Sequence, residues 1–332
     1  DWKIERLNLL ITGGAGYIGS HVVLAAIDCG YEVTVLDDLS TGSLENINPK
    51  TKFIHGSILS KQDLSSLFSN NKFDCIIHLA AKKAAGDSML NAIPYSENNI
   101  IGSLNLINAC SLYGVKNFVF SSTAAVYGKP EYLPIDEKHS LAPTNYYGYT
   151  KLIIEENLKW YCDLNKIRFV SLRYFNAAGY DDKGRITGIE DNPQNLIPLV
   201  MEAALGIKSG IKIFGNDYDT KDGTCIRDYI HVTDLAKAHL DSIDYILKED
   251  KNIIINLGTG RGYSVLEILN EVMNVSGKNI QYNYEERRIG DPDIVIAKAD
   301  LAKELIKWEG QNSNLDSIIK STWDVYKKKL KR

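Results

Sequence analysis

Short apolar segments alternate with longer amphipathic ones along the first half of the chain. The apolar segments occupy consecutive positions, as strands buried on both faces do, whereas the segments between them repeat apolar residues at spacings of three and four, as helices do. This alternation predicts an α/β fold with a doubly wound parallel sheet covered by helices on both faces. The expected strands cover residues 7–12, 31–37, 52–56, 73–81, 116–122 and 168–175, and the expected helices cover 17–29, 61–69, 95–113 and 145–164.

The pattern loosens after residue 176. Glycine, aspartate and asparagine interrupt shorter apolar segments there, for example in "NAAGYDDKGRITGIEDNPQN" and "FGNDYDTKDGTC". We therefore expect one large domain over residues 1–176 and a smaller C-terminal lobe over most of 177–332, with residues 230–258 returning to the large sheet.

A glycine-rich turn follows the first expected strand, in "LNLLITGGAGYIGSH". Gly13, Gly16 and Gly19 lie between this strand and the next helix, a spacing that permits a tight turn and a close approach of the backbone to a pyrophosphate. Asp37 ends the second strand, where a carboxylate accepts hydrogen bonds from a ribose diol and repels a 2′-phosphate. A Rossmann-like domain that binds NAD rather than NADP is predicted.

Three tyrosines begin the expected helix 145–164, in "TNYYGYTK". Only Tyr147 has a lysine four residues later, Lys151, on the same helical face. An ammonium group favours the phenolate and lowers a phenol pKa from about 10, as a general base requires. Thr123 ends the strand before this helix, at the sheet edge where such folds bind ligands. Tyr147, Lys151 and Thr123 are therefore the predicted catalytic residues, and Tyr146 and Tyr149 are interpreted as packing residues.

Composition narrows the class of partner. The 332 residues are 44% hydrophobic with a formal net charge of −4, which disfavours nucleic acid and membrane surfaces as main partners. The five cysteines are scattered, without the spacing of a disulfide framework or a zinc site, and no segment approaches the roughly 20 apolar residues of a membrane span. We expect no metal and a cytoplasmic location.

An ordered series of motifs carries a resemblance along nearly the whole chain. The motifs include "TGGAGYIGSH", "LDDLSTG", "HLAAKKAAGDS", "YSENN", "FSSTAAVYG", "YYGYTK", "RYFNAAG", "IFGNDYDTKDGTCIRDYIHV" and "RRIGDP". The chain resembles the extended short-chain dehydrogenase/reductase superfamily and, within it, the UDP-glucose (UDP-galactose) 4-epimerase family. The resemblance implies a tightly bound NAD, a UDP-sugar substrate in the C-terminal lobe, and reversible epimerisation through a 4-keto intermediate with transient hydride transfer to NAD.

The resemblance also implies residue roles. Lys151 would bind the nicotinamide ribose as well as assist Tyr147, Phe175 would flank the nicotinamide, and Arg227 and Arg288 would hold the diphosphate. His78 and His231 are interpreted as structural. The implied cofactor-binding residues are Gly13, Gly16, Tyr17, Ile18, Gly19, Asp37, Asp38, Leu39, Thr41, Gly42, Ser57, Ile58, Leu79, Lys83, Asn98, Thr123, Tyr147, Lys151 and Phe175; the implied substrate-binding residues are Thr123, Tyr147, Asn176, Asn195, Lys212, Ile213, Phe214, Arg227, Arg288, Asp291 and Val295.

The chain departs from the family pattern at three positions. Ser57 replaces a usual aspartate that reaches the adenine amino group, and Ala92 replaces a usual proline. Val295 stands at a position near the sugar where family members carry tyrosine or smaller residues. A small residue leaves room for an N-acetyl group, so we expect turnover of UDP-N-acetylglucosamine and UDP-N-acetylgalactosamine as well.

Other functions on the same fold remain open. A nucleotide-sugar dehydratase would carry an Asp-Glu pair where this chain has Ala124 and Ala125, which argues against dehydration. A UDP-glucuronate 4-epimerase would need a further cation for the uronate carboxylate. A non-catalytic NAD-sensing scaffold would not need Tyr147 and Lys151. The broad apolar faces of helices 95–113 and 145–164 favour a homodimer, as in the family.

Overall fold

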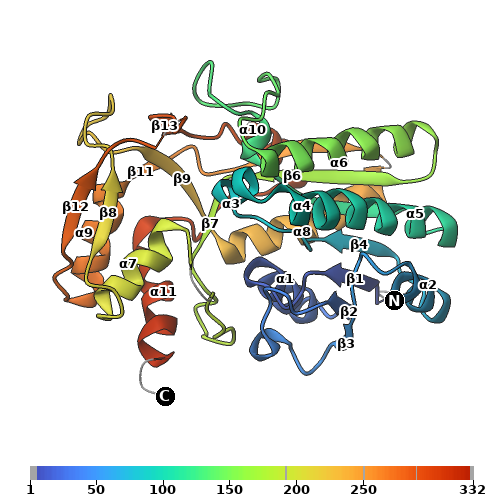
Figure 1. Cartoon of the computed structure of the whole chain (residues 1–332). Helices are drawn as coiled ribbons and strands as arrows, with labels where there is room; N and C mark the ends of the chain where they lie inside the picture. Colours follow the sequence, from blue (N-terminus) through green and yellow to red (C-terminus); the bar gives the residue numbers. More distant parts are fainter. Residues whose placement is uncertain (1–5, 191–192, 250, 289, 330–332) are drawn as a thin grey trace.

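The computed structural model describes residues 6–190, 193–249, 251–288 and 290–329. Its largest element is a seven-stranded sheet in the order β10-β6-β5-β4-β1-β2-β3, visible in Figure 1. Every neighbouring pair of strands is parallel, as the alternating pattern predicted. The strands are β1 (Asn8–Thr12), β2 (Glu32–Asp37), β3 (Lys52–His55), β4 (Cys75–His78), β5 (Asn117–Thr123), β6 (Arg168–Tyr174) and β10 (Ile253–Leu257).

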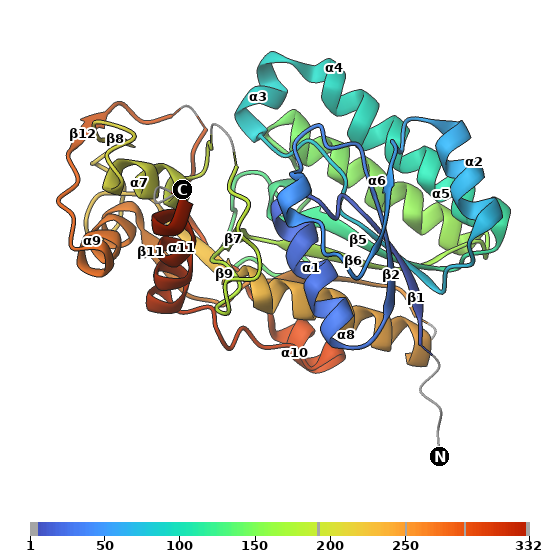
Figure 2. The same ribbon diagram turned by 90° about the horizontal axis from the view of Figure 1, so that it is seen from below.

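Helices cover both faces of this sheet, which gives the three layers seen in Figure 2. Successive residues of β1 point to opposite faces, so Leu9 and Ile11 join one hydrophobic core and Leu10 joins the other. Burying a leucine of this kind contributes about 2 kcal/mol to the free energy of unfolding. One face packs against α1 (Tyr17–Asp28) and α8 (Val232–Glu249), and the other against α2 (Lys61–Asn70), α5 (Ser103–Tyr113) and α6 (Tyr146–Asp163).

The predicted elements agree with the observed ones to within one or two residues in most cases. The expected strand 73–81 is shorter, since β4 ends at His78. The expected helix 95–113 is divided into three segments, because a π-helical stretch interrupts it. The wider turn of a π-helix cannot be recognised from the spacing of apolar residues. These segments are α4 (Ala92–Tyr95), η2 (Ser96–Gly102) and α5; the short helices α3 (Ala85–Leu90) and η1 (Leu44–Asn46) were not predicted.

The second lobe is built around strand β9 (Ile226–His231). This strand pairs in parallel with β7 (Asn176–Ala178) and β13 (Ile294–Val295) and antiparallel with β11 (Gly262–Ser264). A separate parallel pair joins β8 (Ile211–Phe214) to β12 (Tyr282–Glu285). A third hydrophobic core lies among the helices of this lobe. The helices are α7 (Leu196–Ala204), α9 (Val265–Ser276) and α11 (Leu315–Lys329), and α10 (Asp300–Ile306) packs against α8 and β10.

The chain passes between the two sheets more than once. Strand β10 lies beside β6 at one edge of the large sheet, and α8, which precedes it, packs against α1. The predicted domains were assigned by what they bind as well as by where they lie. Their division into a cofactor-binding and a substrate-binding domain therefore stays a prediction. Among the described residues, no helix combines the length and the apolar character needed to cross a membrane.

The second lobe lies against the carboxyl edge of the large sheet. Strand β6 leads through Phe175 directly into β7 of the second sheet. At the start of α1, the Tyr17 hydroxyl donates a hydrogen bond to the carbonyl of Gly179, beyond β7. Since ligands of doubly wound folds bind outside the carboxyl ends of the strands, the functional site is expected between these parts.

Candidate active site

The glycine-rich turn after β1 leaves no space for a side chain at Gly13 or Gly19. Gly13 has a φ of +76°, and a Cβ atom there would lie 2.6 Å from the backbone nitrogen of Ala80. A Cβ atom on Gly19 would lie 1.9 Å from the carbonyl oxygen of Gly13. Helix α1 follows Gly16, which caps it without a side-chain hydrogen bond. The amides of the first turn, which includes Tyr17, Ile18 and Gly19, are therefore free of a capping side chain, and a phosphate group fits them.

Asp37 lies beside this turn at the end of β2. Its carboxylate accepts hydrogen bonds from the backbone N–H groups of Ala15, at 2.9 Å, and Leu39, at 2.8 Å. Burial raises the pKa of Asp37, and the two hydrogen bonds act in the opposite direction. Leu39 has a left-handed φ of 58°, rare for this residue type, which the Asp37 bond helps to hold. The loop continues through Asp38 and Thr41 to Gly42, whose Cβ atom would lie 2.7 Å from that of Ala15.

The other predicted cofactor residues lie at the same sheet edge, but two side chains are directed elsewhere. Ser57 and Ile58 follow β3, Leu79 follows β4, and Phe175 follows β6. The ammonium group of Lys83 pairs with Glu190 of the second lobe. The Asn98 amide of η2 donates to the carbonyl of Pro94 in α4, at 2.9 Å. Ser57 has its backbone N–H bonded to the Asp63 carboxylate, at 3.0 Å.

Tyr147, Lys151 and Thr123 come together where α6 starts against the end of β5. The Asn145 side chain caps α6 by accepting a hydrogen bond from the Gly148 N–H, at 2.8 Å. A Cβ atom on Gly148 would lie 2.5 Å from the carbonyl oxygen of Ala125, so only glycine allows this close packing. Thr123 is hydrogen-bonded to the Tyr147 phenol, and Lys151 donates to the Ser121 carbonyl, at 2.7 Å.

The ionisation of this pair differs from the sequence-based expectation. Burial raises the pKa of Tyr147 to about 12, and the Thr123 hydrogen bond acts in the opposite direction. Burial lowers the pKa of Lys151 to about 7, opposed by the nearby charge of Glu155. Lys151 therefore does not lower the pKa of Tyr147 here. The reason is that its ammonium group is directed at Ser121 and has lost much of its own preference for the charged form.

Two buried residues that sequence reasoning missed hold the start of α6. The Ser88 hydroxyl of α3 accepts a hydrogen bond from the Tyr147 N–H, at 3.0 Å. The Asn99 amide bonds both backbone groups of Lys82 and the Thr150 hydroxyl, at 2.8 to 3.0 Å. The paired asparagines of "YSENN" were a signal for Asn99, whereas no spacing in the sequence indicates Ser88.

Most of the residues interpreted as structural have hydrogen-bond partners inside the protein, and Tyr149 is partly exposed. Tyr146 is hydrogen-bonded to Ser96, at 2.7 Å, and Tyr149 is 46% exposed. The two nitrogens of His78 bond the hydroxyls of Thr12 and Ser103, each at 2.7 Å, and burial lowers the pKa of His78 to about 3. His231 bonds Thr233 at 2.8 Å.

In the second lobe, two consecutive arginines differ in their partners. Arg287 is held by the Asp217 carboxylate, at 2.7 Å, and lies 4.1 Å over the Tyr218 ring. Arg288 lies 4.0 Å over the Phe214 ring and has no carboxylate partner among the described residues. Arg227, Asp291 and Arg288 all act on the pKa of Cys225, which puts them in one neighbourhood. This neighbourhood offers guanidinium groups to an anion.

The remaining predicted substrate residues border this neighbourhood. Asn176 donates to the Asp228 carbonyl, at 3.1 Å, and Val295 pairs with Arg227 between adjacent strands. Asn195 precedes α7 as its N-cap without a side-chain hydrogen bond. Lys212, Ile213 and Phe214 lie along β8, where Lys212 pairs with Glu285 at 3.0 Å and Phe214 carries the Arg288 guanidinium over its ring.

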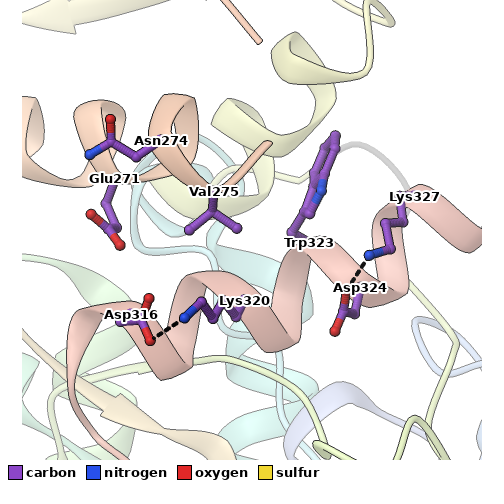
Figure 3. A pocket seen from close by; sticks show the side chains of 8 residues that line it. All are labelled: Glu271, Asn274, Val275, Asp316, Lys320, Trp323, Asp324 and Lys327. Carbon is purple, nitrogen blue, oxygen red and sulfur yellow. Dashed lines mark hydrogen bonds and ion pairs between the residues drawn. The ribbon is translucent and has the colours of Figure 1, made fainter. Parts of the chain in front are cut away.

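A separate hollow of 620 Å³ lies between α9 and α11, shown in Figure 3. Its lysines, Lys320 and Lys327, pair with carboxylates of their own helix, and none of the predicted site residues lines it. In the described part of the chain, no group of three or more His, Cys, Asp or Glu side chains is arranged to hold a metal ion.

Comparisons with family models, curated proteins and solved structures all match epimerases over most of the chain. The model of the NAD dependent epimerase/dehydratase family matches residues 9–258. A UDP-glucose 4-epimerase of Halalkalibacterium halodurans is 43% identical over 320 residues, 96% of this chain and 95% of that protein. The crystal structure of UDP-glucose 4-epimerase from Brucella ovis in complex with NAD has a TM-score of 0.94 and 39% identity, covering 96% of this chain and 98% of that one. The UDP-Glc/GlcNAc 4-epimerase of Campylobacter jejuni has a TM-score of 0.86 and 40% identity, covering 97% and 99%.

Proposed function

The chain belongs to the NAD dependent epimerase/dehydratase family, and we propose that it interconverts UDP-glucose and UDP-galactose by inverting carbon 4 of the sugar. The observation that carries this proposal is the meeting of Tyr147, Thr123 and Lys151 at the carboxyl edge of the sheet. The arginines of the second lobe, Arg227 and Arg288, support the proposal because they could hold the diphosphate of the substrate.

The residues present fit NAD. The glycine turn and the uncapped start of α1 suit a pyrophosphate, and Asp37 at the end of β2 suits a ribose diol. A carboxylate at this position disfavours the 2′-phosphate of NADP. When bound, NAD supplies a reversible hydride acceptor at carbon 4 of the sugar, and its positive nicotinamide favours the phenolate of Tyr147.

The chain's own residues handle the proton and the orientation of the sugar. The Tyr147 oxygen, as the phenolate that a bound nicotinamide would favour, would take the proton of the 4-hydroxyl in the first half-reaction and return it in the second. The Thr123 hydroxyl, bonded to the phenol, holds the reacting oxygen in place. Arg227 and Arg288 hold the diphosphate while the keto sugar turns between the two half-reactions.

The residues immediately after Thr123 favour epimerisation over dehydration. Water elimination requires an acid and a base beside the sugar, and the residues in question form η3 (Ala124–Val126), whose first two side chains are methyl groups. The Ala125 carbonyl is also in contact with Gly148, so this turn serves to dock α6.

Replacing Tyr147 by phenylalanine tests this assignment. Tyr147→Phe is expected to lower kcat for UDP-galactose by on the order of 10²–10⁴-fold, because proton transfer is lost, while the affinity for UDP stays within about twofold. Turnover is measured by the appearance of UDP-glucose, and affinity by calorimetry. Tyr149→Phe, which changes an exposed tyrosine of the same helix, is the control. A variant that retains wild-type turnover would refute the role of Tyr147.

The sugar pocket is proposed to accept N-acetylated substrates too. Val295 is half-buried on β13 beside Arg227, and a valine there leaves more volume than a tyrosine. The similarity to the UDP-Glc/GlcNAc 4-epimerase of Campylobacter jejuni supports this extension.

Enlarging this residue should narrow the substrate range. Val295→Tyr is expected to reduce kcat/KM for UDP-N-acetylglucosamine by about tenfold or more, because an added ring excludes the acetyl group, with a change of less than about threefold for UDP-glucose. Both substrates are assayed side by side with wild-type protein. Equal losses for both sugars, or a wild-type protein that turns over UDP-glucose alone, would exclude the proposal.

A homodimer is proposed through the helices on one side of the large sheet. In Figures 1 and 2, α3, α4, α5 and α6 lie together, and α6 contacts both α3 and η2. Large apolar side chains are exposed on these helices. Monomeric proteins rarely expose so many neighbouring apolar side chains, which favours an interface here. The exposed side chains are Met89, Leu90, Ile93, Ile101, Leu112, Trp160 and Leu164.

Charges placed on this face should separate the subunits. The double variant Leu112→Glu and Trp160→Glu, at residues 79% and 67% exposed, is expected to sediment as a monomer at concentrations where the wild-type protein is a dimer. Ile207→Glu, at an exposed site of the other lobe, is the control and should remain dimeric. Unchanged sedimentation of the double variant would place the interface elsewhere.

We also propose a cytoplasmic location and no nucleic-acid partner. All five cysteines are free thiols, which suits a reducing compartment, and the net charge of −4 disfavours a polyanion.

A further inference from the structure

Glu155 continues the catalytic face of α6. Tyr147, Lys151 and Glu155 follow one another at intervals of four residues, so their side chains lie on one side of the helix. Glu155 has no exposed surface at all, and Lys151 is 3% exposed. A carboxylate so deeply buried beside the active-site lysine is costly unless it is fully paired.

The partner of Glu155 is Arg173 of β6. Its Nη2 and Nε atoms donate to the two carboxylate oxygens at 2.5 and 3.0 Å, and the Ser171 hydroxyl donates to one of them at 2.9 Å. The remaining Nη1 atom of Arg173 donates to the Tyr127 hydroxyl at 3.1 Å, and Tyr127 donates to Asn256 of β10 at 2.6 Å. Both carboxylate oxygens of Glu155 are therefore paired with a guanidinium group in the protein interior.

Glu155 is the anion that acts on Lys151. The Lys151 ammonium donates to the Ser121 carbonyl and lies 5.0 Å from the centre of the Phe120 ring, so its immediate contacts carry no negative charge. Of the titratable groups around it, His78 on β4 is neutral because burial lowers its pKa to about 3, and Tyr147 and Tyr174 are neutral because burial raises theirs. Among the described groups around Lys151, Glu155 is the one whose charge opposes the effect of burial on the lysine pKa.

We propose that Glu155, held in place by Arg173 and Ser171, is a positioning residue that keeps Lys151 cationic and directed at the Ser121 carbonyl during the reaction. This inference rests on the proposed function, in which Lys151 acts as a cation beside Tyr147. The alternative is that the pair only braces α6 against β6.

The decisive variant is Glu155→Gln, which keeps the shape and removes the charge. Burial already lowers the pKa of Lys151 to about 7, and Glu155 opposes that shift, so loss of the carboxylate lowers it further. The pH at which activity falls on the alkaline side should move down by about one unit. Relative to wild type, kcat should fall roughly tenfold at pH 8 and recover at pH 6, with KM little changed.

A measurement without turnover separates this inference from the proposed function. In protein labelled with ¹³C at the lysine ε-carbon, the Lys151 signal, assigned with Lys151→Arg, should titrate at a lower pH in Glu155→Gln than in wild type. A wild-type protein without epimerase activity would refute the function but leave this titration valid as a test.

Two further variants distinguish charge from bracing. Tyr127→Phe cuts the link from Arg173 to Asn256 but leaves Glu155 charged, so the Lys151 titration should not move. If Glu155→Gln fails to fold because Arg173 is left unpaired, the double variant Glu155→Gln and Arg173→Met removes both charges and should still titrate lower than wild type. An unchanged Lys151 titration in a folded Glu155 variant, or an equal shift in Tyr127→Phe, would overturn the proposal.

Discussion

The site depends on the docking of the first turn of α6 onto the end of β5. Gly148 permits this contact, because any larger residue would meet the Ala125 carbonyl at 2.5 Å. The docking brings the Tyr147 phenol to Thr123 and the Lys151 ammonium to the Ser121 carbonyl. From the other side, Ser88 and Asn99 bind the same turn of α6. A rigid proton-transfer group is thereby placed at the open edge of the sheet.

A second constraint is how the two lobes distribute charge. Carboxylates neutralise Arg287 and leave Arg288 without such a partner in the described chain, while Arg227 lies in the same neighbourhood. Lys83, at the sheet edge, instead pairs with Glu190 across the lobes. Some cations therefore join parts of the protein, whereas Arg288 has no carboxylate partner among the described residues and can bind an anion.

Local spacing in the sequence revealed much of this arrangement. The glycines of the first turn, Asp37, and the pair Tyr147 and Lys151 are each defined within a few residues or by the end of a strand, so the pattern predicted both the fold and their place in it. Contacts between segments far apart in the chain could not be predicted from the sequence. Glu155 meets Arg173 only because α6 crosses β6, and the state of Tyr147 follows from burial, which no spacing reports. For that reason the predicted lowering of the Tyr147 pKa by Lys151 is not seen in this structure.

We propose that this chain inverts carbon 4 of the sugar without net oxidation or reduction, because its cofactor is regenerated in each cycle. The most direct measurement is incubation of the purified protein with UDP-galactose, without added NAD, followed by ³¹P and ¹H NMR of the nucleotide sugars. We expect UDP-glucose to accumulate until its ratio to UDP-galactose is constant, with no net oxidation or reduction. A folded protein that leaves UDP-galactose unchanged, even when NAD is supplied, would contradict this proposal.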